Sequence, residues 1–307
     1  MLAAMTKRAQ MPFSAWLPAA ISAPTPVSAL VHSSTLVTAG VYLLIRFNFY
    51  LLERGVRELL IWGGVLTIFI SGLGANFETD IKKVIALSTL SQLGLIVIIL
   101  RVGAVRLAFF HLVIHALFKS TLFMCAGVLI HSVKGGQDSR KMRGFGAGGP
   151  RLILVARVRN LALCGFPFLA GFYSKDMVVE LVLCGGVNMV LGGLIVARVG
   201  LTVSYRLRFI FKRVNEVSYL DRVSGLRDLD KVVFKRVVGL AVFRVIGGFW
   251  GVWWVLGLQG GAVLGFSQKY RILLVMLVRV LRAYYIFESK IKFIFGLKVL
   301  SSFFSSM

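Results

Sequence analysis

The sequence has few acidic residues and few charged residues of any kind. It holds 12 Asp and Glu against 36 Lys and Arg in 307 residues, and only 16% of its residues are charged. Soluble domains carry about 25% charged residues, whereas this chain is 58% apolar with a net charge of +24 and a mean hydropathy of +0.84. This excludes an ordinary soluble domain and favours a membrane protein. Nucleic-acid binding is also disfavoured, because the cations are scattered among long apolar runs instead of forming a solvated basic face.

Cysteine is almost absent. Cys125, Cys164 and Cys184 lie in or beside apolar runs, with no CxxC spacing. A disulfide framework and a zinc site are therefore not supported. Glycine-rich stretches at 135–136 and 146–149 follow no strand pattern, so no dinucleotide or phosphate site is indicated either.

Long apolar runs dominate what is present. A spanning helix needs about 20 apolar residues, and the short polar links between the runs place neighbouring helices antiparallel. No alternating strand pattern occurs, so the predicted fold class is an all-α, polytopic transmembrane helix bundle. The predicted spans are residues 27–46, 57–75, 84–101, 105–132, 151–172, 177–205, 237–258 and 270–287.

Two connections carry many of the cations. Loop 134–151 has five cations and one acid, and segment 206–236 has nine cations and four acids. Two predicted spans separate these connections, so both should face the same side. The positive-inside rule assigns that side to the cytoplasm, or to the matrix in a mitochondrion.

Titratable side chains inside a span are functional candidates, because they are costly at membrane depth. His111, His115 and Lys119 follow one another at spacings of four residues, which places them on one helix face. Histidine titrates near neutral pH and a desolvated lysine can approach it, so this stripe could pass protons through bound water. The alternative is that the three groups only form hydrogen bonds to neighbouring helices.

Helix-breaking sequence accompanies two other lysines. Lys7 precedes Pro12, and Lys175 follows Pro167 and Gly171. Transporters use broken helices to place charge near the membrane midplane. A lysine at a helix end that reaches toward the interface is the alternative, above all for Lys7.

Two further titratable residues accompany these candidates. Asp176 follows Lys175 directly and could pair with it. His32 shares a predicted helix face with Ser28 and Thr35. A packing role for His32 is as plausible as a place on a proton path.

Four segments resemble the antiporter-like membrane subunits of respiratory complex I. They are residues 6–44, 76–94, 107–127 and 160–176, and the resemblance covers about residues 1–180. It implies proton translocation along titratable groups at the membrane midplane, driven by quinone reduction elsewhere in the complex. The positions that match the proton-carrying residues of this family are Lys7, His32, His111, His115, Lys119, Lys175 and Asp176.

The resemblance also implies partners and a location. We expect a hetero-oligomer with other membrane-arm subunits and lipid in the mitochondrial inner membrane, without nucleic acid. NADH, flavin, iron–sulfur clusters and ubiquinone would be bound by partner subunits and no cofactor by this chain. The alternatives are a subunit of a cation/proton antiporter, which shares the broken helices and lysines, and a non-pumping structural bundle.

The family is built from two inverted repeats of five helices. The expected division here is 1–56 as the end of the first repeat, 57–205 as the second repeat, and 206–307 as a basic loop with C-terminal helices. About six further helices precede the position of Lys7 in the family. We therefore expect that the sequence starts at an internal methionine of a longer product, or that the product is split.

Arginine is unexpectedly frequent, with 22 residues against 14 lysines. Arg157 and Arg159 stand two residues apart, and Arg198, Arg244 and Arg279 interrupt other apolar runs. Each would cost about 2.5–3.5 kcal/mol at mid-helix. The family more often has small polar residues before NLALCG, and some mitochondrial codes read AGA and AGG as serine. We hypothesise that several of these arginines are serines translated with the wrong table.

Overall fold

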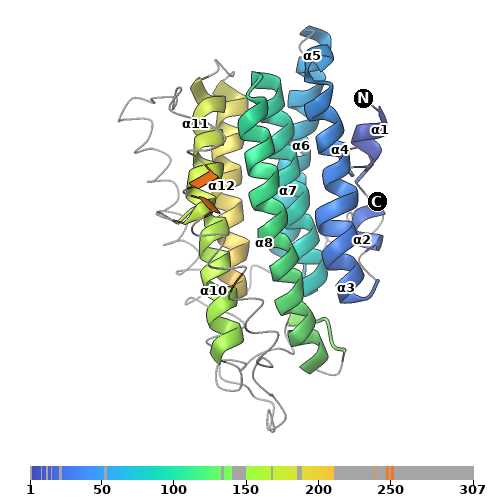
Figure 1. Ribbon diagram of the computed structural model, residues 1–307, viewed down its shortest axis with the longest axis vertical. Helices are drawn as coiled ribbons and strands as arrows, with labels where there is room; N and C mark the ends of the chain where they lie inside the picture. Colours follow the sequence, from blue (N-terminus) through green and yellow to red (C-terminus); the bar gives the residue numbers. More distant parts are fainter. Residues whose placement is uncertain are drawn as a thin grey trace, which may run out of the picture.

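Long helices running side by side make up the computed structural model of the chain, and its described residues contain no β-strand (Figure 1). The predicted all-α class is therefore confirmed. The described residues are 2–132, 135–139, 150–166, 169–184 and 189–210, apart from positions 8, 12, 15, 21–22 and 52–53, together with 239, 247–248 and 250–251.

Three uninterrupted helices form the centre of the bundle: α6 (Arg54–Phe77), α7 (Ile81–Val102) and α8 (Val105–Ser132). Helix α7 is almost fully buried, as expected of a helix covered by neighbours all round, and its buried residues include the polar run from Ser88 to Gln92. It crosses α6 closely at Gly94, where a Cβ would lie only 2.7 Å from Thr67 Oγ1. Small residues at such crossings let helix backbones approach.

The N-terminal region is a series of short helical pieces on one side of this centre (Figure 1). The chain begins with α1 and reaches its first long helical stretch through a π-helical segment, η1, that continues directly into α4. The pieces are α1 (Leu2–Lys7), α2 (Trp16–Ala20), α3 (Thr25–Val27), η1 (Ser28–Thr35), α4 (Leu36–Arg46) and α5 (Asn48–Leu51).

A second interrupted helix lies on the opposite side of the bundle, beside a long final helix (Figure 1). Helix α10 ends at a turn in which Gly165 has φ +90°, a conformation that glycine adopts without strain. The chain resumes as π-helical segment η3 and then α11. The elements are α10 (Pro150–Cys164), η3 (Phe172–Asp176), α11 (Met177–Cys184) and α12 (Met189–Ile210).

Four of the eight predicted spans agree with the structure, two have wrong boundaries, and two lie largely outside the described residues. Within the described part of the chain, five helical stretches are long and apolar enough to cross a membrane: Thr25–Arg46, Glu58–Phe77, Ile81–Val102, Val105–His131 and Val190–Arg208. The predicted spans 151–172 and 177–205 are wrong in their boundaries. In the first, the observed helix α10 ends at Cys164, before the predicted boundary at 172, because the chain turns at Gly165. The second predicted span joins two separate helices, α11 and most of α12. Apart from isolated positions, the predicted spans 237–258 and 270–287 lie outside the described residues.

The polar connections meet at one end of the bundle. Backbone contacts join the link between α6 and α7 to the segment after α8, where the Ile81 amide donates to the Gln137 carbonyl at 3.2 Å. Near the end of α12, the Arg208 guanidinium donates to the carbonyls of Asn76 and Glu78. The ends of the two basic connections therefore lie on the same side, as predicted. Which compartment that side faces stays a prediction.

Candidate functional site

The centre of the candidate site is a row of three buried side chains on α8. His111, His115 and Lys119 are 4%, 2% and 0% exposed. The structure thus confirms that the stripe faces the interior of the bundle and not its outer surface. The ring centroids of the two histidines are 6.3 Å apart, and their nitrogens have no hydrogen-bond partner among the described residues.

Lys119 is held by α7, which covers its side of α8. Its ammonium group donates to the Ile85 carbonyl at 3.1 Å and to the hydroxyl of Ser88. Both acceptors are neutral, and no ion pair to Lys119 occurs within the described part of the chain. A buried lysine changes its protonation state readily, and one held only by neutral acceptors can lose its proton without leaving a carboxylate unpaired.

Lys175 occupies the interruption between α10 and α11. It is 2% exposed and donates to Thr202 Oγ1 on α12 at 3.0 Å and to the Cys164 carbonyl at 3.3 Å. Cys164 is the last residue of α10, so no backbone N–H of that helix donates a hydrogen bond to its carbonyl. The break therefore supplies one of the two groups that hold the lysine. The predicted interruption between residues 160 and 185 is confirmed, although Pro167 lies outside the described residues.

Gly171 allows the two halves of the interrupted helix to pack tightly. A Cβ at this position would lie 1.8 Å from the Ala162 carbonyl oxygen of α10. No side chain fits at that distance. The glycine is thus required by contact between the backbones, and this contact sets the position of Lys175 four residues later.

A small cavity lies between the two histidines of α8 and Lys175. Its volume is about 10 Å³, and polar groups from three elements line it: Gln92 of α7, His111 and His115 of α8, and Ser174 and Lys175 of η3. A cavity holds a water molecule from about 10–15 Å³ upward, provided that polar partners surround it. This cavity is therefore at the size limit for one water between the histidines and the lysine.

Asp176 is buried with Lys175, yet no direct ion pair joins these two described residues. Successive residues on a helix do not face each other, which explains why no direct ion pair forms, and a longer-range pairing of Asp176 with Lys175 stays a prediction. The Oδ1 atom of Asp176 has no hydrogen-bond partner among the described residues. Its carboxyl group is thus buried next to Lys175 in the sequence without a direct ion pair to it.

The structure does not bring Lys7 to this buried group. Lys7 ends α1 with an exposed side chain, on the side of the bundle opposite α10 and α11 (Figure 1). The backbone of His32 lies in η1, and its side chain is outside the described residues. The predicted shared face of Ser28 and Thr35 is wrong, since the first is buried and the second exposed. The wider turn of a π-helix changes which residues align.

Sequence reasoning missed the polar residues that neighbouring helices contribute. Ser88 and Gln92 lie four residues apart on α7, and Thr202 lies four residues after Arg198 on α12. Arg198 donates from Nη2 to Gln92 Oε1 at 2.9 Å. The available signal was the polar run STLSQ inside an otherwise apolar span. It shows that α7 has a polar face but not which helix meets that face.

The sequence matches proteins of one family over most of the described region. The family model described as NADH:quinone oxidoreductase/Mrp antiporter, TM, matches residues 1–202. NADH-ubiquinone oxidoreductase chain 5 of Anopheles gambiae is 49% identical over 293 residues, which cover 95% of this chain and 50% of the relative. The protein of the same name from Aedes aegypti is 53% identical over 248 residues, which cover 81% and 43%. The chain thus spans about half the length of these curated relatives.

A solved structure extends the likeness to the fold. A chain of the Mrp complex from Dietzia sp. DQ12-45-1b superimposes with a TM-score of 0.73 and 29% sequence identity, covering 98% of this chain and 36% of that chain. The fold of this chain is therefore shared with a chain of that complex.

Proposed function

Because the chain belongs to the NADH:quinone oxidoreductase/Mrp antiporter transmembrane family, we propose that it translocates protons as a membrane-arm subunit of an NADH:ubiquinone oxidoreductase. Relatives named as chain 5 of that enzyme at 49–53% identity support this choice. Quinone reduction in other subunits would drive the transport. This chain would carry out no redox chemistry itself.

The observation that carries the proposal is the burial of Lys119 with two histidines in register on α8. An ionisable group deep in a membrane protein is costly unless it has a function or a charge partner. Lys119 contacts Ser88 and the Ile85 carbonyl, both uncharged. A structural role would be served more cheaply by an apolar residue, so proton transfer is the better explanation.

We assign a role to each residue in this scheme. Lys119 is the central carrier, and His111 and His115 relay protons between it and the cavity beside Lys175. Lys175 and the buried carboxyl of Asp176 form the next station toward the exit. Lys7 and His32 would serve the entrance side, as the family resemblance implies.

The assembly and its location follow from the same proposal. The chain would join other membrane-arm subunits in a hetero-oligomer of the mitochondrial inner membrane, with its basic connections facing the matrix. NADH, flavin, iron–sulfur clusters and ubiquinone would be bound by partner subunits. We also retain the division into an end of a first repeat at 1–56, a second repeat at 57–205 and a C-terminal part at 206–307.

The test is the number of protons pumped per electron by the intact complex that carries Lys119→Met. We expect pumping to fall severely while the complex still assembles, because methionine fills a similar volume without a titratable group. Lys83→Met is the matched control, since Lys83 lies at the exposed start of α7 and pairs with Asp80 at 3.4 Å. Unchanged pumping in Lys119→Met would leave only a structural role for this bundle.

A cation/proton antiporter is the second candidate, and the likeness to a chain of an Mrp complex favours it. The two candidates differ in composition and in driving force. A purified complex with flavin and iron–sulfur clusters that pumps protons upon NADH oxidation identifies the first. A particle without these groups that exchanges protons for Na⁺ identifies the second.

A further inference from the structure

Three arginines lie in the interior of the bundle, where a permanent positive charge is hardest to accommodate. Arg159 of α10 is 2% exposed, and Arg198 and Arg206 of α12 are 0% and 3% exposed. None of them forms an ion pair with a carboxylate among the described residues. Arginine stays protonated in proteins, so it cannot escape the cost of burial by losing its charge.

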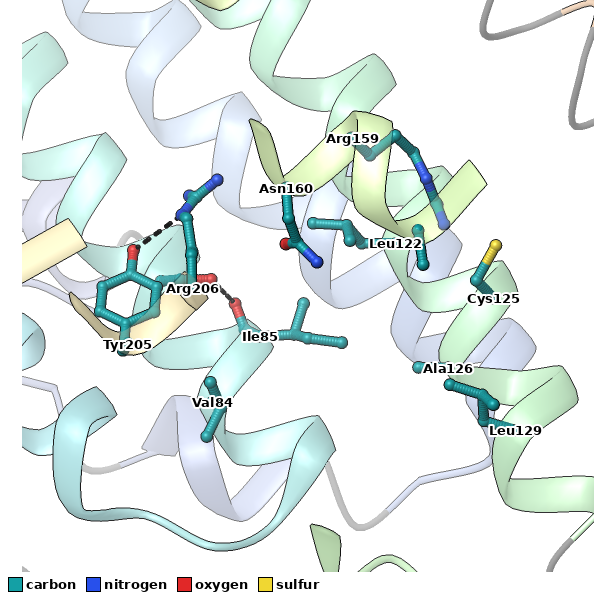
Figure 2. Close-up of a pocket in the computed structure, with 12 residues that line it drawn as sticks. Val84, Ile85, Leu122, Cys125, Ala126, Leu129, Arg159, Asn160, Tyr205 and Arg206 are labelled. Carbon is teal, nitrogen blue, oxygen red and sulfur yellow. Dashed lines mark hydrogen bonds between the residues drawn. The ribbon is translucent and has the colours of Figure 1, made fainter. Parts of the chain in front are cut away.

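The hydrogen bonds of these guanidinium groups are also incomplete. A guanidinium has five N–H donors. Arg159 donates from Nε to the Val155 carbonyl of its own helix at 3.0 Å, and its two terminal nitrogens have no oxygen or nitrogen acceptor among the described residues. They point toward Cys125 (Figure 2), and a cysteine sulfur is a weak hydrogen-bond acceptor for a guanidinium.

The two arginines of α12 show the same deficit. Arg206 approaches the Tyr205 hydroxyl at 3.5 Å through Nε and lies 5.5 Å from the centre of the Tyr205 ring, but both of its terminal nitrogens lack hydrogen-bond partners among the described residues. Arg198 uses one terminal nitrogen, while its Nε and Nη1 have none.

Arginines elsewhere in the same bundle are placed where the fold satisfies them. Arg208, two residues after Arg206, donates to two backbone carbonyls at the polar end of the bundle. Arg101 lies 3.8 Å from the carboxylate of Glu58 at the opposite end of α7. Arg208 and Arg101 thus have carbonyl or carboxylate partners near the ends of the bundle, whereas the three buried arginines lie in its interior without a carboxylate partner among the described residues.

We propose that positions 159, 198 and 206 carry serine in the functional protein, with AGA or AGG codons that a mitochondrial code reads as serine. A serine hydroxyl in a helix can donate to a carbonyl three or four residues earlier, so it is satisfied without a charge partner. Other serines of the same region do this, as Ser88 donates to the Ile85 carbonyl at 2.7 Å and Ser204 to the Leu201 carbonyl at 2.8 Å. The physical argument stands without the proposed function, and only the choice of genetic code rests on it.

Serine at these positions changes the surroundings of the candidate site. Arg159 and Arg206 lie on either side of Asn160 in the wall of a cavity of about 30 Å³ (Figure 2), which Ser88 also lines. Ser88 is the residue that accepts the hydrogen bond of Lys119. At this cavity two long side chains, Arg159 and Arg206, would give way to hydroxyl groups, and the added polar space would suit ordered water.

The same change acts on the cavity beside Lys175. Arg198 contacts Gln92, which lines that cavity together with His111 and Lys175. A hydroxyl at position 198 would leave the Gln92 amide free to bind water there. Serines at positions 198 and 206 would thus place two hydroxyl groups on the α12 side of the polar interior. They would replace two fixed cations that would repel a passing proton.

The identity of these residues can be read directly from the natural protein. The complex is purified from its source, the subunit is cleaved with chymotrypsin, and the peptides that cover positions 159, 198 and 206 are sequenced by mass spectrometry. We expect serine at all three and arginine at position 208, which is the internal control. Arginine at any one of the three would overturn the proposal for that position.

The codons give an independent check, since AGA or AGG should stand at the three positions and a CGN codon at position 208. The outcome does not depend on whether the chain pumps protons. Serine at the three positions together with full pumping in Lys119→Met would refute the proposed function alone. Arginine at the three positions together with lost pumping would refute the serine assignment alone.

Arg157, Arg244 and Arg279 are not included. Arg157 is exposed on the opposite face of α10 from Arg159, so burial provides no argument there. Arg244 and Arg279 lie outside the described residues.

Discussion

The described part of the bundle has two interrupted helical regions, and they differ in whether their lysine is buried. In the C-terminal region, from α10 to α11, Lys175 is buried and bound by a carbonyl that the break has freed and by a hydroxyl of α12. In the N-terminal region, Lys7 ends α1 with an exposed side chain. A break in a helix therefore does not by itself place a lysine in the interior. Burial requires neighbouring helices that cover the break and offer acceptors.

The largest loss of stability should come from a side chain at Gly171, where the backbones of α10 and the residues just before η3 are in close contact. In Gly171→Ala, the new Cβ would overlap the Ala162 carbonyl oxygen, so α10 and η3 would have to move apart. Overpacking of this kind costs about 1–3 kcal/mol or more, and we expect a lower melting temperature and less assembled complex. Gly193→Ala is the control, because no atom lies within 4 Å of its added Cβ. Equal behaviour of the two variants would show that the close contact is not needed.

The hydroxyl that binds Lys175 should matter next. Thr202→Val keeps the shape of the side chain and removes the acceptor of a 3.0 Å hydrogen bond. Leaving a buried donor unpaired costs about 1–3 kcal/mol, so we expect proton pumping to decrease several-fold with little loss of assembly.

Thr121→Val is the control for this variant. Thr121 is equally buried, but its hydroxyl donates only to carbonyls of its own helix, from Leu117 and Phe118. The two variants are compared by protons pumped per electron at equal amounts of assembled complex. A loss of pumping of the same size in both would show that Thr202 acts through packing and not through Lys175.

Lys7→Met should have the smallest effect on stability, because exposed substitutions usually change it by less than about 0.5 kcal/mol. Its melting temperature should match that of the unchanged complex. Pumping is the informative measurement. A decrease would show that the exposed lysine carries protons as proposed, and that partner subunits complete the N-terminal break. Unchanged pumping would confine the path to the C-terminal region.

Features of single helices could be predicted from the sequence, because they depend on local spacing. The apolar runs indicated four of the spans, and the four-residue spacing of His111, His115 and Lys119 indicated their common face. The end of α10 could not be placed, since apolar residues continue through the turn at Gly165. An apolar run predicts that a helix can form there, but it does not predict the residue at which the helix ends.

Contacts between helices could not be predicted in this way. The acceptors of Lys119 and Lys175 lie on other helices, 31 and 27 residues away in the sequence for Ser88 and Thr202. The one partner that proximity in sequence suggested, Asp176 for Lys175, forms no direct ion pair with it. Only the packing of α7, α8 and α12 determines which polar groups meet.

The most direct measurement of proton transfer by Lys119 is the number of protons pumped per electron in Lys119→Arg. Arginine retains the positive charge and the hydrogen-bonding capacity, but it does not release its proton under physiological conditions. If Lys119 carries protons, this variant should fail to pump as severely as Lys119→Met. Pumping at the level of the unchanged complex would show that only the charge at position 119 is needed, and would contradict a proton-carrying role for this lysine.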